Sequence, residues 1–263
     1  MLLTINGEAD NGKDYVADYL CKNLDLVKIS LADPMKRFVR QLFGFPADNL
    51  WGASEKRNEL LDAQPLWNAA FTQLHTMHQF TAAVVSESLG PDVRARAFDG
   101  LQTWFTTLRR QNPEKLSARV VLQTLGTEWG RETYPNLWID YLFNVQLPLL
   151  AQGYSYRYDL GVILNDGLED GERHVRRGIC IPDQRFENEL EAFESRGGTT
   201  LRVRRLSRVR RDGGNTGITG HKSELEQRGI PDERFSKVFN FEEGLDHVNA
   251  QLDEWLKPIC GVI

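Results

Sequence analysis

Cysteine is scarce in this chain of 263 residues. Cys21, Cys180 and Cys260 are odd in number and lie far apart, without the spacing of a metal site or a disulfide framework. They indicate a reducing environment. No apolar run has membrane-spanning length, and the short apolar N-terminus lacks the basic lead-in of a signal peptide. We therefore expect a cytoplasmic protein that makes no membrane contact.

An excess of basic residues is also missing, because the formal net charge is -5. This balance argues against a general nucleic-acid coat, so we expect no nucleic-acid partner. It leaves room for a small anionic substrate, which a few well-placed arginines can bind. With 41% hydrophobic residues, the chain can bury one large core with a smaller appended unit.

The stretch from Gly7 to Asp14 combines two glycines with a lysine between an apolar run and a helical pattern. Residues 1–5 read as a strand and residues 15–20 as a helix. This is the context of a phosphate-binding P-loop, in which backbone amides form an anion nest at a helix N-terminus. An ordinary glycine turn before a helix is the alternative. In the P-loop interpretation, Gly7, Asn11, Gly12, Lys13, Asp14 and Tyr15 contact ATP.

Asp14 departs from the usual motif, which has a serine or threonine hydroxyl for Mg²⁺ at this position. A carboxylate is a suitable hard ligand for Mg²⁺, but without the metal it repels phosphate. We predict that Lys13 reaches the β- and γ-phosphates and that Asp14 holds Mg²⁺, directly or through water.

Residues 26–31 read as a second strand, followed by a helix from Pro34 to about Phe43 with Asp33 as its N-cap. Ligands lie at the carboxyl ends of strands in α/β sheets. Asp33 and Lys36 are therefore candidates to contact a second substrate, with capping as the alternative for Asp33.

Residues 44–118 have a different character and read as a helical insertion that covers the substrate. Helices are predicted over residues 55–63, 66–88 and 92–111, separated by proline and glycine.

A polar stripe follows the insertion. Arg119, Gln123 and Thr127 are spaced by four and share one side of a predicted helix. Most such stripes are solvated faces. Here Gly126 and Trp138 accompany the stripe, and an indole is an aromatic surface on which a base can stack. The group is therefore a candidate nucleotide site.

Residues 158–164 and 174–181 read as strands of one hairpin. The second ends near Asp183, where a carboxylate could hold Mg²⁺ through water, and Arg185 could bind phosphate in a bidentate manner. The alternative is a salt-bridged helix start, with Glu189 paired to Arg185 at i,i+4.

Residues 199–203 read as the next strand, and residues 204–220 are strongly basic and then glycine-rich. This segment is either a solvated basic loop or a lid whose arginines, beginning with Arg204 and Arg205, close on the triphosphate. His221 opens a short helix, residues 238–240 read as a last strand, and residues 245–256 as a closing amphipathic helix.

Taken in order, these segments resemble one family, the bacteriophage deoxynucleoside monophosphate kinases. The resemblance extends over nearly the whole chain outside the insertion. Tyr15 stands where the family usually has threonine, and Asn11 where it often has serine. The matching segments are Gly12-Lys13-Asp14, Ala32-Asp33-Pro34-Met35-Lys36, Leu122-Gln123-Thr124-Leu125-Gly126-Thr127, Trp138, Asp183-Gln184-Arg185-Phe186-Glu187-Asn188-Glu189 and His221-Lys222-Ser223-Glu224.

The resemblance implies an α/β fold: a P-loop kinase core with a mostly parallel sheet flanked by helices, formed by residues 1–43 and 119–263, with residues 44–118 as a helical insertion. It implies transfer of the ATP γ-phosphoryl group to a deoxynucleoside monophosphate with Mg²⁺, in a protein that forms a homodimer. Lys13, Asp14, Asp183 and Arg185 would be catalytic. The monophosphate would be bound by Asp33, Lys36, Arg119, Gln123, Gly126, Thr127, Trp138, Arg185 and Glu189.

Two rival functions stay open. The first is another P-loop small-molecule kinase, acting on dephospho-coenzyme A or a nucleoside. The second is a non-enzymatic protein in which ATP orders the basic loop to hold nucleic acid, which would show as salt-sensitive binding without phosphorylation of an acceptor.

Overall fold

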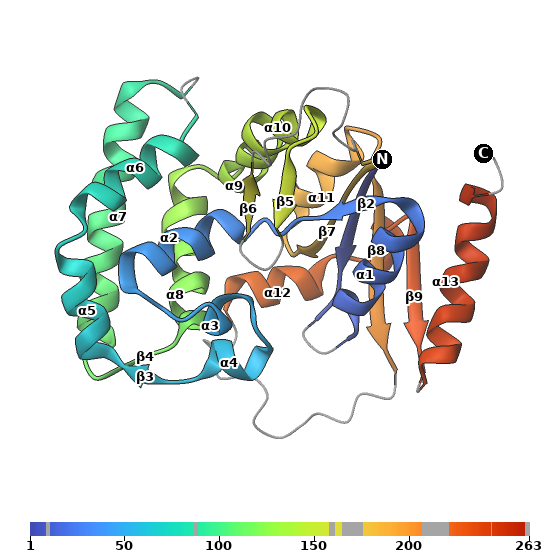
Figure 1. Ribbon diagram of the computed structural model, residues 1–263, viewed down its shortest axis with the longest axis horizontal. Helices are drawn as coiled ribbons and strands as arrows, with labels where there is room; N and C mark the ends of the chain where they lie inside the picture. The colour runs from blue at the N-terminus through green and yellow to red at the C-terminus, as the bar shows by residue number, and fades with distance from the viewer. Residues whose placement is uncertain are drawn as a thin grey trace.

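A five-stranded, wholly parallel sheet forms the centre of the protein in a computed structural model (Figure 1). The structure describes residues 1–8, 11–86, 89–157, 161–164, 176–206, 221–242 and 244–260. The strand order is β2-β7-β1-β8-β9. The strands are β1 (Leu2–Asn6), β2 (Leu26–Lys28), β7 (Gly178–Gln184), β8 (Thr199–Arg205) and β9 (Lys237–Phe241).

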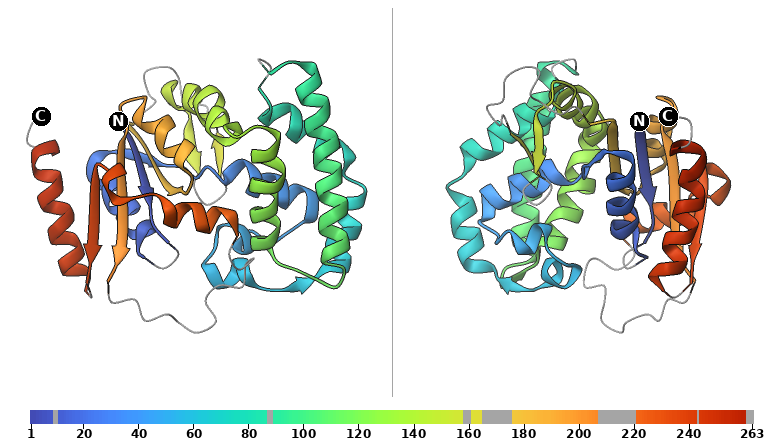
Figure 2. Two further views of the ribbon diagram at one scale, coloured as in Figure 1. Left: turned by 180° about the vertical axis from the view of Figure 1, so that it is seen from behind. Right: turned by 45° about the vertical axis from the view of Figure 1, so that its right-hand side comes forward.

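Helices cover both faces of the sheet (Figure 2). Side chains alternate along a strand, so Leu3 and Cys180 pack in the cluster under α1 (Lys13–Leu24) and α13 (Leu245–Cys260). Ile179 and Ile181 pack on the opposite side. That side is covered by α11 (Glu187–Glu194) and by the segment formed by η3 (Leu142–Gln146) and α10 (Leu147–Ala151). The predicted α/β class with a parallel sheet flanked by helices is confirmed.

Strand β1 lies at a topological switch point. The chain leaves β1 for β2 on one side, and β8 and β9 lie on the other. Adjacent connections diverge at such a point and leave a crevice at the carboxyl ends of the strands, where ligands bind in open α/β sheets. The stretch that follows Asn6 opens into this crevice.

A helical body stands beside the sheet and holds the largest hydrophobic cluster (Figure 1). Phe43, Trp67 and Trp104 pack there with their rings mostly edge to face. The body consists of α2 (Asp33–Phe43), α3 (Asp48–Trp51), α4 (Ser54–Asn58), α5 (Ala63–Phe71), α6 (Leu74–Val84), α7 (Pro91–Gln111), α8 (Ala118–Thr124), η2 (Leu125–Arg131) and α9 (Leu137–Tyr141), with the strand pair β3 (Leu61–Asp62) and β4 (Lys115–Leu116).

Cluster membership extends beyond the predicted insertion at residues 44–118. Phe38 of α2, Val121 of α8 and Trp138 of α9 pack within the helical body rather than on the sheet. The amphipathic faces of these flanking helices need an apolar partner, and the insertion supplies it.

Several predicted elements differ in detail. The helix expected over residues 92–111 is confirmed as α7. The helix expected over residues 66–88 is divided into α5 and α6, where the Thr72 hydroxyl donates to the carbonyl of Ala69 (3.1 Å) and competes with the backbone ladder. The expected helix over residues 55–63 is replaced by α4 and β3.

The predicted hairpin of residues 158–164 with 174–181 is wrong. Strand β6 (Val162–Leu164) pairs antiparallel with β5 (Ser155–Arg157), and β7 pairs parallel with β1 and β2. Residues 158–160 and 165–175 lie outside the described residues. The apolar run of β7 is buried on both faces, which suits a central parallel strand.

Helix α12 (Lys222–Gly229) and the short 3₁₀ turn η4 (Asp232–Arg234) connect to β9. The predicted helix start at His221 is confirmed, since the His221 ring caps α12 by accepting from the amide of Ser223 (3.3 Å). Most of the predicted basic lid, residues 207–220, lies outside the described residues. Among the helices that are described, none has the length and apolarity needed to cross a membrane.

Candidate functional site

The predicted phosphate loop lies at the carboxyl end of β1, against β8. A β-carbon on Gly7 would lie 2.8 Å from the carbonyl oxygen of Val203, so no side chain fits without a shift of backbone. Gly12 has φ +82° and precedes α1 without a side-chain cap on that helix. Residues 9 and 10 lie outside the described part. Gly12 therefore leaves the first amides of α1 without a side-chain cap, and free amides at a helix N-terminus can bind an anion.

A polar line of buried side chains fixes the strand ends beneath the loop. The Asn6 amide donates to Gln184 Oε1 (2.8 Å), and the Arg202 guanidinium donates to Asn6 Oδ1 (3.1 Å). These residues join the carboxyl ends of β7, β1 and β8. None of these three residues was among the site residues predicted from the sequence.

Lys13 is a mostly buried basic group at this edge, and its pKa is lowered. Burial lowers its pKa first, the charges of Arg185 and Arg57 lower it further, and Asp14 and Asp183 act in the opposite direction. Its ammonium lies 3.6 Å from Asp14 Oδ2, and its side chain is only 17% exposed. Three cations therefore act on one another at the N-terminus of α1, a position that an anionic ligand would stabilise.

Arg57 was not predicted from the sequence. It belongs to α4 of the helical body, and its guanidinium donates to the carbonyl of Gly52 (2.8 Å), which orients it. The distance of 44 residues from Lys13 leaves no local signal, so only the fold brings the two charges together.

Asp14 and Tyr15 point in different directions at the start of α1. The Asp14 side chain is 59% exposed beside Lys13. The Tyr15 hydroxyl donates to Asn249 Oδ1 of α13 (2.7 Å), so the ring is held toward the last helix. The structure therefore assigns the Tyr15 side chain to the packing of α1 on α13.

Asp183 joins the ends of two strands. Its carboxylate accepts from the Ser30 hydroxyl (2.5 Å) and from the amides of Leu31 (3.1 Å) and Ala32 (3.2 Å). These contacts fix the turn between β2 and α2 against the end of β7. A carboxylate has about four acceptor positions, so one remains for a water molecule.

Arg185 and Glu189 do not form the side-chain pair considered in the sequence. The Glu189 carboxylate accepts from the backbone amides of Arg185 (2.8 Å) and Phe186 (3.0 Å), and it lies 3.3 Å from Arg131 Nη1. Burial raises the pKa of Glu189, and Arg131 partly offsets this effect. The Arg185 guanidinium remains available near Lys13, and its charge also lowers the pKa of His221.

Asp33 is wholly buried, and neither predicted role agrees with its surroundings. The N-cap of α2 is Ala32, so Asp33 is the first helical residue. Its carboxylate accepts from the Ser30 amide (3.1 Å), from Trp51 Nε1 (3.2 Å) and from the Tyr156 hydroxyl, and Lys36 Nζ lies 3.3 Å away. Burial raises its pKa. With 0% exposure and these partners, Asp33 holds β5 and α3 to α2, and the predicted substrate contact would require these elements to move.

Lys36 accompanies Asp33 in this buried position. The residue is 8% exposed, and its ammonium lies 5.9 Å from the ring centroid of Trp51. The predicted contact of Lys36 with a monophosphate would require the α3 side of the helical body to move.

The predicted stripe lies where the helix changes type. Arg119 and Gln123 are on α8, whereas Gly126 and Thr127 are in the π-helical segment η2. Single π-helical turns are often found at functional sites. Arg119 Nε donates to Asn58 Oδ1, which places the Arg119 guanidinium beside α4. Asn58 directly follows Arg57 in the sequence.

Trp138 is a packed residue. Its side chain lies in the helical cluster with 4% exposure, and the indole N–H donates to the Gly126 carbonyl (3.0 Å). The ring lies against Phe80 and Trp129. The indole has no exposed ring face for the predicted stacking of a base. Trp138 instead packs against η2 and supports it from the helical body.

Arg204 and Arg205 lie at the carboxyl end of β8, where the predicted lid begins. Arg204 Nη1 pairs with Asp232 Oδ2 (2.6 Å) and remains 46% exposed. Arg205 is exposed. Their predicted contact with ATP depends on residues 207–220, which lie outside the described part.

Metal binding was predicted at Asp14 and Asp183. The part of the chain that the structure describes contains no group of three or more histidine, cysteine, aspartate or glutamate side chains that could hold a metal ion. The charges of both aspartates nevertheless act on Lys13. Two hard carboxylates fit Mg²⁺ only if water and phosphate oxygens complete its coordination, which is the usual situation for Mg²⁺ in phosphate sites.

Comparison with protein-family models and with curated proteins found no match for this chain.

Proposed function

We propose that the protein is a P-loop kinase that transfers the γ-phosphoryl group of ATP to a deoxynucleoside monophosphate. The observation that carries this proposal is the mostly buried Lys13 ammonium at the N-terminus of α1, whose pKa is lowered by burial and by the charges of Arg185 and Arg57. Lys13 begins α1, Arg57 belongs to the helical body, and Arg185 directly follows β7. Like charges that repel one another in the free protein are stabilised when they share a polyanion.

The donor triphosphate is held by the loop. The glycine-bounded turn and the first amides of α1 face the phosphates, and Lys13 neutralises charge in a mostly buried position. Low local polarity strengthens this interaction. Bound Mg²⁺ would neutralise charge on the phosphate oxygens, with Asp14 and Asp183 holding its water ligands.

The acceptor lies between the sheet edge and the helical body. Arg185 and Arg57 hold its phosphate, and the α8–η2 segment with Arg119, Gln123 and Thr127 lines the nucleoside side. The proposal that the acceptor is a deoxynucleoside monophosphate rests on the resemblance of the motifs, in their order along the chain, to those of the bacteriophage deoxynucleoside monophosphate kinases. Catalysis in this arrangement is mainly alignment of the acceptor phosphate with the γ-phosphoryl group and neutralisation of charge, because a loose transition state needs little covalent help.

A coupled assay with ATP and each deoxynucleoside monophosphate, natural and modified, tests the proposal. We expect a nucleoside diphosphate product with at least one acceptor. Lys13→Met is expected to lower kcat by orders of magnitude, and Arg57→Gln to raise the acceptor KM more than the ATP KM. Lys56→Met removes an exposed charge from the same helix as Arg57 and serves as the control.

Three outcomes contradict the proposal. Turnover in Lys13→Met close to that of the natural protein removes the loop from the mechanism. Equal effects of Arg57→Gln and Lys56→Met on the acceptor KM show that Arg57 acts only through the overall charge and does not bind the acceptor phosphate. Phosphorylation only of a nucleoside or of dephospho-coenzyme A keeps the kinase chemistry but replaces the acceptor class.

A further inference from the structure

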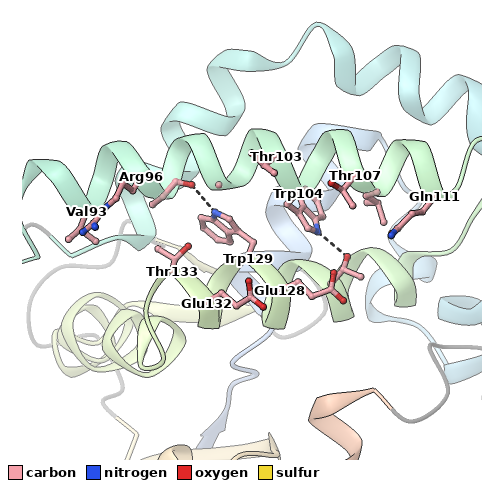
Figure 3. Close-up of a pocket in the computed structure, with 14 residues that line it drawn as sticks. Val93, Arg96, Thr103, Trp104, Thr107, Gln111, Glu128, Trp129, Glu132 and Thr133 are labelled. Carbon is pink, nitrogen blue, oxygen red and sulfur yellow. Dashed lines mark hydrogen bonds between the residues drawn. The ribbon is translucent and has the colours of Figure 1, made fainter.

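A cavity lies in the helical body, and no described residue of the phosphate loop lines it. Helix α7 runs beside α8 and η2, and the groove between them has a volume of about 580 Å³, within the usual range of small-ligand sites (Figure 3). Its floor is closed by two indoles. Trp104 Nε1 donates to Thr124 Oγ1 (2.9 Å), and Trp129 Nε1 donates to the Ala97 carbonyl (2.8 Å).

The open part of the groove is polar. Glu128 of η2 and Glu132, which directly follows η2, lie on one wall, and the hydroxyl-bearing Thr103 and Thr107 lie along α7 (Figure 3). Trp104 and Trp129 are 6% and 2% exposed, so the floor offers no aromatic face for a stacked ring. This lining disfavours a flat heteroaromatic ligand and favours a flexible aliphatic one with hydrogen-bond donors.

Charge defines the ligand further. Burial and the neighbouring Glu132 raise the pKa of Glu128, so the binding of a cation that stabilises its ionised form is favoured. Glu128 Oε1 lies 4.0 Å from His221 Nε2, and both burial and Arg185 lower the pKa of that imidazole, which favours its neutral form. The pair of carboxylates therefore repels phosphate and carboxylate ligands and attracts a cation.

Spacing fits a diamine. Glu128 and Glu132 are four residues apart on the same wall, and side chains with this spacing are neighbours on a helical surface. A linear diamine such as butane-1,4-diamine can therefore place one ammonium group at each carboxylate. Arg96 lines one end of the groove near Thr133 and would repel an additional ammonium group there (Figure 3). A longer amine would extend the other way, over Thr103 and Thr107.

We propose that the groove between α7 and η2 binds a linear aliphatic polyamine, with two ammonium groups at Glu128 and Glu132. The site is independent of phosphoryl transfer, because neither carboxylate belongs to the proposed kinase site. The cavity and its charges carry the proposal, and the experiment below needs no catalytic activity.

Isothermal titration calorimetry on the full chain with butane-1,4-diamine and with spermidine tests this site. We expect saturable binding with one ligand per chain. Glu132→Gln should weaken binding about threefold to fivefold, as expected for an exposed ion pair. The matched control is Glu114→Gln, which removes the same charge from an exposed position outside the groove lining.

A steric variant tests the location without changing charge. Gly100 lines the groove, and a β-carbon there would lie 3.6 Å from Trp129 Cδ1, an ordinary contact distance. Gly100→Leu should fill the groove and abolish measurable binding while circular dichroism shows a folded protein. Absence of binding at millimolar amine, equal weakening by Glu114→Gln and Glu132→Gln, or undiminished binding to a folded Gly100→Leu variant would each overturn the proposal.

Discussion

The conformation of Gly12 offers a direct test of the phosphate loop. Gly12 has φ +82° and Gly197, at the end of α11, has φ +72°, and both have open space where a β-carbon would stand. Alanine at either position therefore meets no steric contact. It does meet the backbone cost of the left-handed region, about 1–2 kcal/mol for a residue with a β-carbon.

Gly197→Ala should lower the free energy of unfolding by this amount, measured by urea denaturation, because its turn stays left-handed in the folded protein. Gly12→Ala should lower it less, because a loop that relaxes in the free protein no longer carries the backbone cost. Their effects on ATP binding should differ. If the loop of Gly12→Ala relaxes in the free protein, ATP must restore the left-handed turn, and the same 1–2 kcal/mol then raises its Kd about 5- to 30-fold. Gly197 lies between α11 and the start of β8, at the opposite edge of the sheet from the loop. Gly197→Ala should therefore leave the Kd for ATP unchanged.

Calorimetric titration of ATP into both variants decides the matter. The reasoning is refuted if the two variants lose the same stability and also bind ATP equally well. Such a result would reduce the turn at Gly12 to an ordinary helix start.

Three further predictions concern buried polar groups. Burial raises the pKa of Asp33, so between its usual pKa and that higher value the folded protein holds a proton that the unfolded chain releases. The stability that this group contributes is complete at low pH and is lost as pH rises through the pKa of the folded state. Asp33→Asn should therefore reduce the fall in the free energy of unfolding between pH 4 and 8, measured by denaturation at each pH. An unchanged pH dependence in that variant would contradict this origin. Arg131→Met removes the cation that lowers the pKa of Glu189, whose side chain is 6% exposed. The free energy of unfolding should fall by about 3–5 kcal/mol at pH 8, and by less at pH 5, where protonation of Glu189 removes its unpaired charge. Equal losses of stability at the two pH values would argue against this origin. Thr124→Val leaves the Trp104 indole N–H without its acceptor and should cost about 1–3 kcal/mol in urea denaturation, whereas an unchanged midpoint would show that another acceptor replaces the hydroxyl.

Several local elements could be predicted from the sequence alone. The apolar run of residues 1–5, the glycines that follow and the helical spacing after Lys13 predict strand, loop and helix because each signal is contained within a few residues. The same holds for α7 and for the cap of α12 at His221. A central strand at residues 178–184 could also be recognised as apolar, but its partners could not.

Tertiary structure decided which elements meet. Strand β6 pairs with β5 rather than with β7, because register and pairing depend on contacts distant in sequence. Asp33 is enclosed by Trp51 and Tyr156, so a polar residue that suits a ligand site is instead a buried junction. Arg57 is brought toward Lys13 by the folding of the helical body against the sheet. Periodicity and turn chemistry act over one or two turns of chain, whereas burial and the convergence of charge are properties of the assembled molecule.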